Sequence, residues 1–280
     1  MKKIGFIDYY ISEWHANNYP AWIKGICEQE GYDYKVAYAW AEMEKSPVTG
    51  ETTGEWCARM DVEQCATIEE LCEKSDVIII LAPSDPDKHL GYAEKVLAYG
   101  KRTYIDKTFA PDYSTAVQIF EAGKKGNADF FTSSALRYAI ELDDLIGGQY
   151  MITQGGGGNY EEYIIHQIEM VVKTLGIGAE AVCVETQGRQ AITRVKFEEG
   201  KQATMVFAPA YPFTVCVEDS NGKNIYRKVE SDTFNALLKD ILHFFETGEK
   251  SFDGAQTLEV MKIRESAIKA KSEAGVWIKI

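Results

Sequence analysis

Two side chains that can act on a hydroxyl group stand at informative places in the sequence. Lys107 follows the predicted strand 102–106 (RTYID), and His166 lies in a helical pattern four residues after Glu162. Removing a hydride from a secondary alcohol requires that the hydroxyl proton leave as well, so the site needs a base that titrates near neutral pH. Histidine is such a base, and a carboxylate one helical turn away can orient it. Lys107, His166 and Glu162 are therefore the catalytic candidates, with the lysine holding the substrate oxygen.

Each of these residues also has an ordinary structural interpretation. A lysine is more often a solvated surface residue, and only its place at the carboxyl end of a strand favours a functional role for Lys107. His166 stands among isoleucines and can equally be a core histidine with satisfied hydrogen bonds. Glu162 and Glu169, which flank it, can be exposed helix charges.

The first half of the chain alternates short apolar runs with helical patterns. The run 76–82 (DVIIILA) is apolar almost throughout, as in a strand buried on both faces of a parallel sheet. Repeated units of this kind form a Rossmann-like, doubly wound sheet that binds ligands beyond the carboxyl ends of its strands. The predicted strands are 3–8, 34–39, 76–82, 102–106 and 128–133. The predicted helices are 20–30 with Pro20 first, one that opens at Thr67, 85–100 and 112–125.

Two other regions have a different character. Segment 40–66 shows no clean period, and a connection of that length predicts a lid or a surface segment. Beyond residue 147 a helix is predicted at 160–175, followed by closely spaced strands at 181–186, 191–197, 202–208, 213–218 and 224–229. Helices at 232–246 and 255–274 and a strand at 276–280 complete the pattern. We therefore predict a dinucleotide-binding domain at 1–134 and an α+β domain with an open antiparallel sheet at 135–280.

Composition excludes several classes of function. The net charge of −13 and the pI of about 4.9 disfavour binding to nucleic acid or to an anionic membrane. No apolar stretch is long enough to span a bilayer and no leader is recognised, so we expect a cytoplasmic protein. The six cysteines lack metal-ligand spacing, which predicts reduced, mostly buried thiols and no metal site.

Three segments, in order, resemble the glucose-fructose oxidoreductase and inositol dehydrogenase family. In 76–110 a strand ends in a proline turn and the next strand ends in Asp106-Lys107-Thr108, where the family has Glu-Lys-Pro. In 160–176 (YEEYIIHQIEMVVKTLG) an acid precedes a histidine by four residues, although the family usually has aspartate where Glu162 stands. Residues 244–280 are similar to the family's closing helix and strand. Together these segments and the strand order cover most of the chain.

The resemblance implies an oxidoreductase that uses NAD or NADP and acts on a secondary hydroxyl of a sugar, inositol or related polyol. It assigns Lys107 to anchoring the reacting oxygen, His166 to carrying the proton and Glu162 to orienting the imidazole. It also implies a homodimer or homotetramer, because the family's sheet commonly packs against another subunit. The candidates for cofactor contact are Asp8, Tyr10, Ile11, Ser12, Pro83, Ser84 and Asp106.

The dinucleotide fingerprint is absent from this sequence. A G-x-G-x-x-G turn lets the backbone approach the pyrophosphate at the start of the first helix, whereas the turn at 8–13 (DYYISE) contains no glycine. The second strand also lacks the expected ribose-binding acid, for which Glu42 or Glu44 would have to substitute. Two interpretations remain: a dinucleotide in an altered pose, favoured because the catalytic candidates are kept, or a non-catalytic relative that binds a sugar or nucleotide.

Two further groups are candidates for substrate binding. Segment 12–19 is dense in hydrogen-bonding and stacking side chains, so Trp14, His15 and Asn18 are predicted to line a sugar site. The alternative is a helix-capping segment with a half-buried tryptophan. Arg137 and Tyr138 resemble an arginine-aromatic pair at the family's domain junction, where they would contact substrate or form an interdomain salt bridge.

Overall fold

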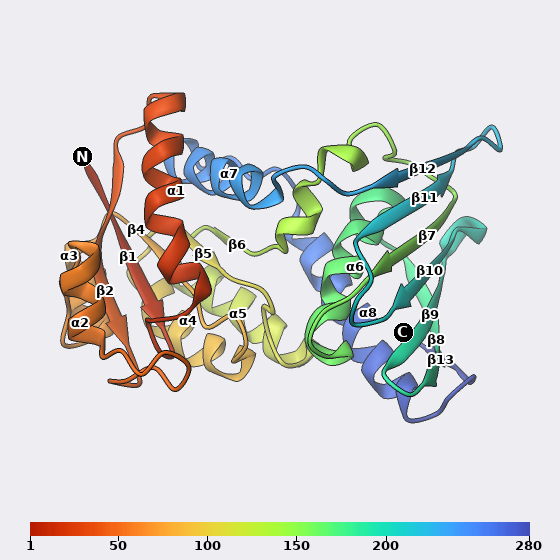
Figure 1. Ribbon diagram of the computed structural model, residues 1–280, viewed down its shortest axis with the longest axis horizontal. Coiled ribbons are helices and arrows are strands. Elements are labelled where there is room, and N and C mark those ends of the chain that lie inside the picture. Colours follow the sequence, from red (N-terminus) through yellow and green to blue (C-terminus); the bar gives the residue numbers. More distant parts are fainter. The chain divides into compact units, whose positions relative to one another are not determined.

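The computed structural model describes residues 1–280 and divides them into two units (Figure 1). The first unit comprises residues 1–133 and 237–251, and the second comprises 134–236 and 252–280. The sequence had placed all of 135–280 in one domain, whereas most of helix α7 (Thr233–Thr247) belongs to the first unit. No helix is both long enough and apolar enough to cross a bilayer.

The first unit is built on a six-stranded sheet with the order β3-β2-β1-β4-β5-β6. Every neighbouring pair is parallel, and the four side chains of β4 are buried. This confirms the predicted Rossmann-like sheet, whose order reverses between β1 and β4, where such sheets bind ligands. The strands are β1 (Lys2–Asp8), β2 (Tyr34–Ala41), β3 (Glu63–Gln64), β4 (Val77–Ile80), β5 (Thr103–Ile105) and β6 (Phe130–Phe131).

The helices of this unit largely follow the predicted pattern, with one important exception. Thr67 and Asp112 cap their helices as side-chain acceptors. The first helix, however, begins at Trp14 with Glu13 as its N-cap, so the prediction that it opens at Pro20 was wrong. The helices are α1 (Trp14–Glu30), α2 (Thr53–Met60), α3 (Ile68–Lys74), α4 (His89–Leu97) and α5 (Tyr113–Gly126), with the 3-10 turn η1 (Pro86–Lys88) before α4.

Gly5, the glycine nearest the missing fingerprint, has a packing role. A Cβ at this position would lie 2.4 Å from Ser75 Oγ and 2.5 Å from Leu71 Cδ2. Contacts that close leave no room for a side chain, because α3 and the residue that follows it press directly on β1. Gly5 therefore allows α3 to pack closely against β1, and this packing explains the glycine without a phosphate.

The second unit contains a seven-stranded sheet with the order β12-β11-β7-β10-β9-β8-β13. All pairs are antiparallel except β7 with β10, so the predicted antiparallel sheet is in fact mixed. Helices α6 (Tyr160–Leu175) and α8 (Gly254–Lys271) lie together against one face of it (Figure 1). The strands are β7 (Tyr150–Gly155), β8 (Ala179–Gln187), β9 (Gln190–Phe197), β10 (Gln202–Phe207), β11 (Thr214–Glu218), β12 (Asn224–Lys228) and β13 (Trp277–Lys279).

Candidate functional site

Two buried carboxylates stand at the carboxyl edge of the parallel sheet. Asp8 ends β1 and Asp106 follows β5, and each residue is only 1% exposed. Asp8 Oδ1 accepts hydrogen bonds from the backbone N–H of Tyr9 at 2.7 Å and of Ala82 at 3.0 Å. Asp106 Oδ1 accepts from the Tyr104 hydroxyl at 3.1 Å. The Oδ2 atom of each carboxylate is buried without a hydrogen-bond partner, which is unusual and marks the site for a functional explanation.

His15 connects the start of α1 to this pair of carboxylates. Its Nδ1 lies 3.1 Å from Glu13 Oε2, and its Nε2 lies 3.8 Å from Asp106 Oδ2. Burial lowers the pKa of His15, but the charges of Asp106 and Glu13 outweigh burial, so the net pKa is raised. The imidazole is therefore held as a bridge between a helix-capping carboxylate and a carboxylate at the sheet edge.

The cluster opposes the entry of further negative charge. The pKa of Asp8 is raised well above its usual range by burial, then by the Glu13 carboxylate and by Asp106. The hydroxyl of Tyr19 is buried without a partner, and burial together with Asp106 and Glu13 raises its pKa as well. A negative ligand would add a like charge to this set, whereas hydrogen-bond donors would complement it.

The raised pKa of Asp8 predicts a pH-dependent difference between the wild type and Asp8→Asn. A carboxyl group whose pKa is higher in the folded state contributes stability below its unfolded pKa of about 4, and that contribution is lost as pH rises toward the folded value. Asparagine is neutral throughout and keeps the oxygen that accepts from Tyr9 and Ala82. We expect the variant's Tm to exceed that of the wild type by a growing margin from about pH 4 to about pH 8.

The matched control is Asp112→Asn. The hydrogen bond from the Thr115 N–H lowers the pKa of Asp112, so its carboxylate stabilises the fold above the unfolded pKa, and this stability is lost as pH falls. The Tm of this variant should fall behind that of the wild type as pH rises to about 5 and then stay below it by a constant margin, with the opposite sign to Asp8→Asn. Thermal melts from about pH 2 to about pH 8 measure both, and parallel curves for the wild type and Asp8→Asn above about pH 4 would contradict the first expectation.

Lys107 lies directly after Asp106 in the loop that leaves β5. Its Nζ donates to the Pro83 carbonyl at 3.2 Å, and the Lys107–Thr108 peptide bond is cis. His89, a fully buried residue for which no role was predicted, fixes the surrounding loops: its Nε2 lies 2.5 Å from the Leu81 carbonyl and its Nδ1 lies 3.0 Å from the Phe109 carbonyl. The loops after β4 and β5 are thus tied to one another, and the half-buried lysine is supported between them.

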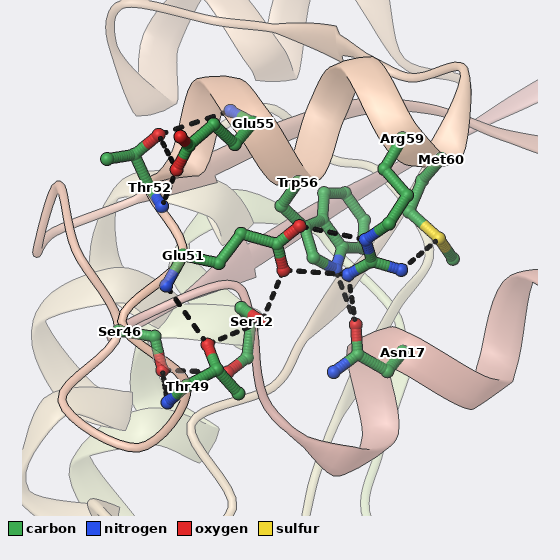
Figure 2. Close-up of polar contacts among 10 residues, drawn as sticks. All are labelled: Ser12, Asn17, Ser46, Thr49, Glu51, Thr52, Glu55, Trp56, Arg59 and Met60. Atoms are coloured by element: carbon green, nitrogen blue, oxygen red, sulfur yellow. Dashed lines mark hydrogen bonds and ion pairs between the residues drawn. The ribbon is translucent and has the colours of Figure 1, made fainter.

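The turn before α1 is covered by the segment for which a lid was predicted (Figure 2). The Ser12 hydroxyl donates to Glu51 Oε2 at 2.6 Å and accepts from Thr49 Oγ1 at 2.9 Å. The Ser46 hydroxyl donates to the Ser12 carbonyl at 2.8 Å. Ser12, predicted to contact a cofactor, therefore has its hydroxyl and its carbonyl bonded within the chain.

Helix α2, which was not predicted from the sequence, holds the segment before it in place. Arg59 donates to both carboxylate oxygens of Glu51 at 2.8 Å and lowers the pKa of Glu51 to about 2. Arg59 and the indole N–H of Trp56 also both donate to Asn17 Oδ1, each at 2.9 Å (Figure 2). Because Trp56 is fully buried, α2 is packed against the rest of the unit.

The three predicted sugar-binding side chains have different surroundings. Trp14 is 51% exposed and packs edge-to-face on Trp22, with ring centroids 5.5 Å apart. His15 is buried, and the Asn18 amide donates to the Trp14 carbonyl at 2.6 Å. The ring of Trp14 is partly exposed to solvent, and sugar binding by the three residues stays a prediction.

In the second unit, His166 is oriented by Ser134. Its Nδ1 lies 2.6 Å from Ser134 Oγ, and its ring packs near Tyr163 and Phe213. A hydroxyl can donate to a bare ring nitrogen or accept from a protonated one, so Ser134 can support the imidazole in both proton states. Glu162 lies in the first turn of α6 and accepts a hydrogen bond from the Asn159 amide at 3.1 Å. The contact with Ser134 could not be predicted from the sequence, because Ser134 precedes the histidine by 32 positions.

Glu169 and Arg137 extend this arrangement. Glu169 is 4% exposed, so it is not the exposed helix charge that one interpretation of the sequence allowed. Its Oε1 accepts from the Ser134 N–H at 3.2 Å, and its Oε2 pairs with Arg137 Nη1 at 2.9 Å. Arg137 also contacts the Gln256 amide oxygen and lies 3.9 Å from the Phe252 ring. This ion pair lies within one unit and holds Ser134, and through it His166.

The remaining predictions about chemistry can be compared with the structure. No group of three or more His, Cys, Asp or Glu side chains is arranged to hold a metal ion, and the six cysteines are unpaired. Lys107 belongs to the first unit and His166 to the second, so their joint action stays a prediction. Roles for Tyr10, Ile11, Ser84 and Tyr138 stay predictions as well.

Comparison with known proteins identifies the architecture. No family model and no curated protein sequence matches the chain. Among solved structures, a probable dehydrogenase from Thermotoga maritima is similar with a TM-score of 0.81 and 14% identity, over 99% of this chain and 98% of that one. The chain shares the fold of that protein over almost its whole length.

Two more structures share this fold over nearly their full length. A protein assigned as a myo-inositol dehydrogenase from Sinorhizobium meliloti 1021 has a TM-score of 0.78 and 13% identity, with all of both chains covered. A protein of gentamicin A biosynthesis, solved in complex with NAD, has a TM-score of 0.78 and 12% identity over 100% of this chain and 97% of that one.

The turn between β1 and α1 does not fit the diphosphate of a dinucleotide in the position common to Rossmann folds. There the diphosphate accepts hydrogen bonds from N–H groups at the helix start. In this chain the N–H groups of His15 and Ala16 donate to the carboxylate of Glu13, and Asp8 adds a second buried carboxyl group nearby. These N–H donors are already used within the chain, and the Glu13 carboxylate that accepts from them would repel a negative ligand.

Proposed function

We propose that the chain is an oxidoreductase of the glucose-fructose oxidoreductase and inositol dehydrogenase family. It transfers a hydride between a nicotinamide cofactor, NAD or NADP, and a secondary hydroxyl of a sugar, inositol or related polyol. The observation that carries the proposal is a fold shared with solved dehydrogenases over the full length of the chain, with a lysine two residues after the end of β5. The carboxyl edge of the sheet is where folds of this type perform their chemistry.

The chain's own residues supply the proton chemistry in this proposal. The ammonium of Lys107 donates a hydrogen bond to the reacting oxygen and stabilises the negative charge that develops as its proton leaves. The imidazole of His166 takes that proton during oxidation and returns it during reduction. Ser134 and Glu162 are the two positioning candidates, the first by its 2.6 Å contact and the second by its place on α6.

Oligomer formation is part of the same proposal. Some side chains of β7, β9 and β12 point away from α6 and α8. Their cross-strand partners in the neighbouring strands lie on the same face of the sheet. Large apolar side chains among them are exposed, which favours burial against another subunit in a homodimer or homotetramer. These exposed side chains are Tyr150, Ile152, Ile192 and Tyr226.

A substrate panel tests the proposed function. The purified protein is incubated with inositols, sugars and nucleotide sugars in the presence of NAD or NADP, and formation of the reduced nicotinamide is followed by absorbance. Turnover of one polyol class supports the proposal. If no substrate is turned over while a sugar or nucleotide still raises the Tm, the chain is the non-catalytic binding relative instead.

A further inference from the structure

We propose that Glu13 takes the place of the dinucleotide's diphosphate at the start of α1, so that this chain recognises a nicotinamide nucleotide by its nicotinamide end alone. The inference rests on the proposed function, since it specifies how the cofactor of that function is held. It predicts that the chain binds the phosphate-free nicotinamide riboside as well as it binds the dinucleotide.

The carboxylate of Glu13 already occupies the anion position of the helix. Its oxygens accept from the N–H of His15 at 2.8 Å and of Ala16 at 2.5 Å. An anion bound to these first-turn N–H groups also compensates the partial positive charge of the helix terminus, which is about half an elementary charge. Glu13 is 8% exposed, so the carboxylate is fixed within the protein and is not a mobile surface group.

Other N–H groups of the same turn are also used. The Tyr9 N–H donates to Asp8 Oδ1 at 2.7 Å, and the Glu13 N–H donates to the Ile11 carbonyl at 2.9 Å. A diphosphate placed here would have to displace bonds made by the chain itself. It would also meet Asp8, whose raised pKa reflects burial beside Glu13 and Asp106. Bringing two more negative charges to such a group is electrostatically unfavourable.

Segment 42–51 is hydrogen-bonded to the turn between β1 and α1. The N–H of Glu42 donates to the Asp8 carbonyl at 3.1 Å, and the N–H of Met43 donates to the Tyr9 carbonyl at 2.8 Å. On the other side, Ser12 is bonded to Glu51, Thr49 and Ser46 (Figure 2). A phosphate could enter this turn only if hydrogen bonds on both sides of it were broken. The conformation of the turn is therefore stabilised by the surrounding segment.

The residue at the position expected to bind the adenosine ribose also makes its hydrogen bonds within the chain. Glu42, the residue that could substitute for the missing ribose-binding acid, accepts from Lys88 Nζ at 2.5 Å and from the Tyr92 hydroxyl at 2.7 Å. Lys88 Nζ in turn lies 4.5 Å from the centre of the Tyr9 ring. The adenosine half of a dinucleotide would thus add few contacts. Lys107 is absent from all of these contacts, so they leave the proposed reaction site unchanged.

The decisive measurement compares NADH with reduced nicotinamide riboside, which carries no phosphate, by fluorescence titration of the wild-type protein. The expected dissociation constants differ by less than about 3-fold, because the adenosine diphosphate half makes no net contribution. Glu13→Ser keeps a side chain that caps helices well and removes the carboxylate. This variant should bind NADH at least about 10-fold more tightly than the wild type, while binding of the riboside changes less.

Asp253→Ser is the matched control, because Asp253 is also a carboxylate N-cap, with Oδ1 accepting from the Ala255 N–H at 2.8 Å, but it caps α8 in the second unit. It makes the same chemical change and should leave both affinities unaltered. Glu13→Gln is the second variant if the serine variant does not fold. It removes the charge, keeps the side-chain length, and should shift NADH binding in the same direction by a smaller factor.

The outcomes separate this inference from the proposed function. If the wild type binds NADH more than about 10-fold more tightly than the riboside, and neither Glu13 variant gains affinity, the inference is overturned and the function stands. If the wild type binds neither ligand but Glu13→Ser binds NADH, Glu13 does occupy the diphosphate position and the nicotinamide-dependent function is lost. If no protein binds either ligand, both are overturned.

Discussion

Lys107→Met is expected to lower kcat/KM for polyol oxidation by about 1,000-fold while leaving the fold intact. In the proposed site the ammonium donates to the oxygen on which negative charge develops, and removing one such donor from an enzyme typically costs a factor of this size. Methionine fills a similar volume without the charge. The structural loss is small, because the ammonium's hydrogen bond is a single contact of 3.2 Å to the Pro83 carbonyl.

Lys107→Arg is the matched control for charge. It keeps a cation that can reach the Pro83 carbonyl, but its planar guanidinium presents donors in a different geometry, so we expect an intermediate loss of about 10- to 100-fold. Steady-state kinetics on the substrate found in the panel, together with thermal melts of each variant, measure both effects. If Lys107→Met retains more than about a tenth of wild-type kcat/KM, the lysine does not contact the reacting oxygen in the transition state.

The architecture could be predicted from the sequence because it depends on local patterns. The apolar run at 76–82 reports a strand buried on both faces, and residues 160–175 have helical periodicity that matches α6 at both ends. The short elements β3 and α2 lie in a segment without a clear period, and their stability comes from tertiary contacts such as Trp56 with Asn17. Patterns within the sequence do not report contacts of that kind.

The start of α1 shows how a common preference can mislead. Proline is frequent at the first helical position, which favoured Pro20, yet the helix begins earlier because Glu13 caps it and the proline lies inside. The cluster of Asp8, Glu13 and Asp106 joins residues from β1, α1 and the end of β5, so their spacing in the sequence carries no trace of their proximity. The sequence shows that the turn at 8–13 has no glycine. It does not show that the Glu13 carboxylate accepts the hydrogen bonds a phosphate would otherwise accept.

His166→Asn is expected to lower kcat for oxidation by about 100-fold or more and to remove the dependence of the rate on pH near neutrality. In the wild type the imidazole must be neutral to accept the substrate proton, so oxidation should accelerate as pH rises through the titration of the base. Asparagine has no proton to exchange in this range, yet its amide can still bond to Ser134 Oγ, which lies 2.6 Å from the native ring. Rate measurements across pH on both proteins test this expectation.

Two further variants decide which neighbour positions the imidazole. Ser134→Ala removes the contact to Nδ1, and we expect a loss in kcat of about 10-fold with a displaced pH profile and little change in KM. Glu162→Gln keeps the shape of the side chain and removes its charge. If the serine orients the ring, the glutamine variant retains nearly full activity. If instead Glu162→Gln displaces the profile and Ser134→Ala does not, the pairing implied by the family resemblance operates here, and the 2.6 Å contact to Ser134 is structural.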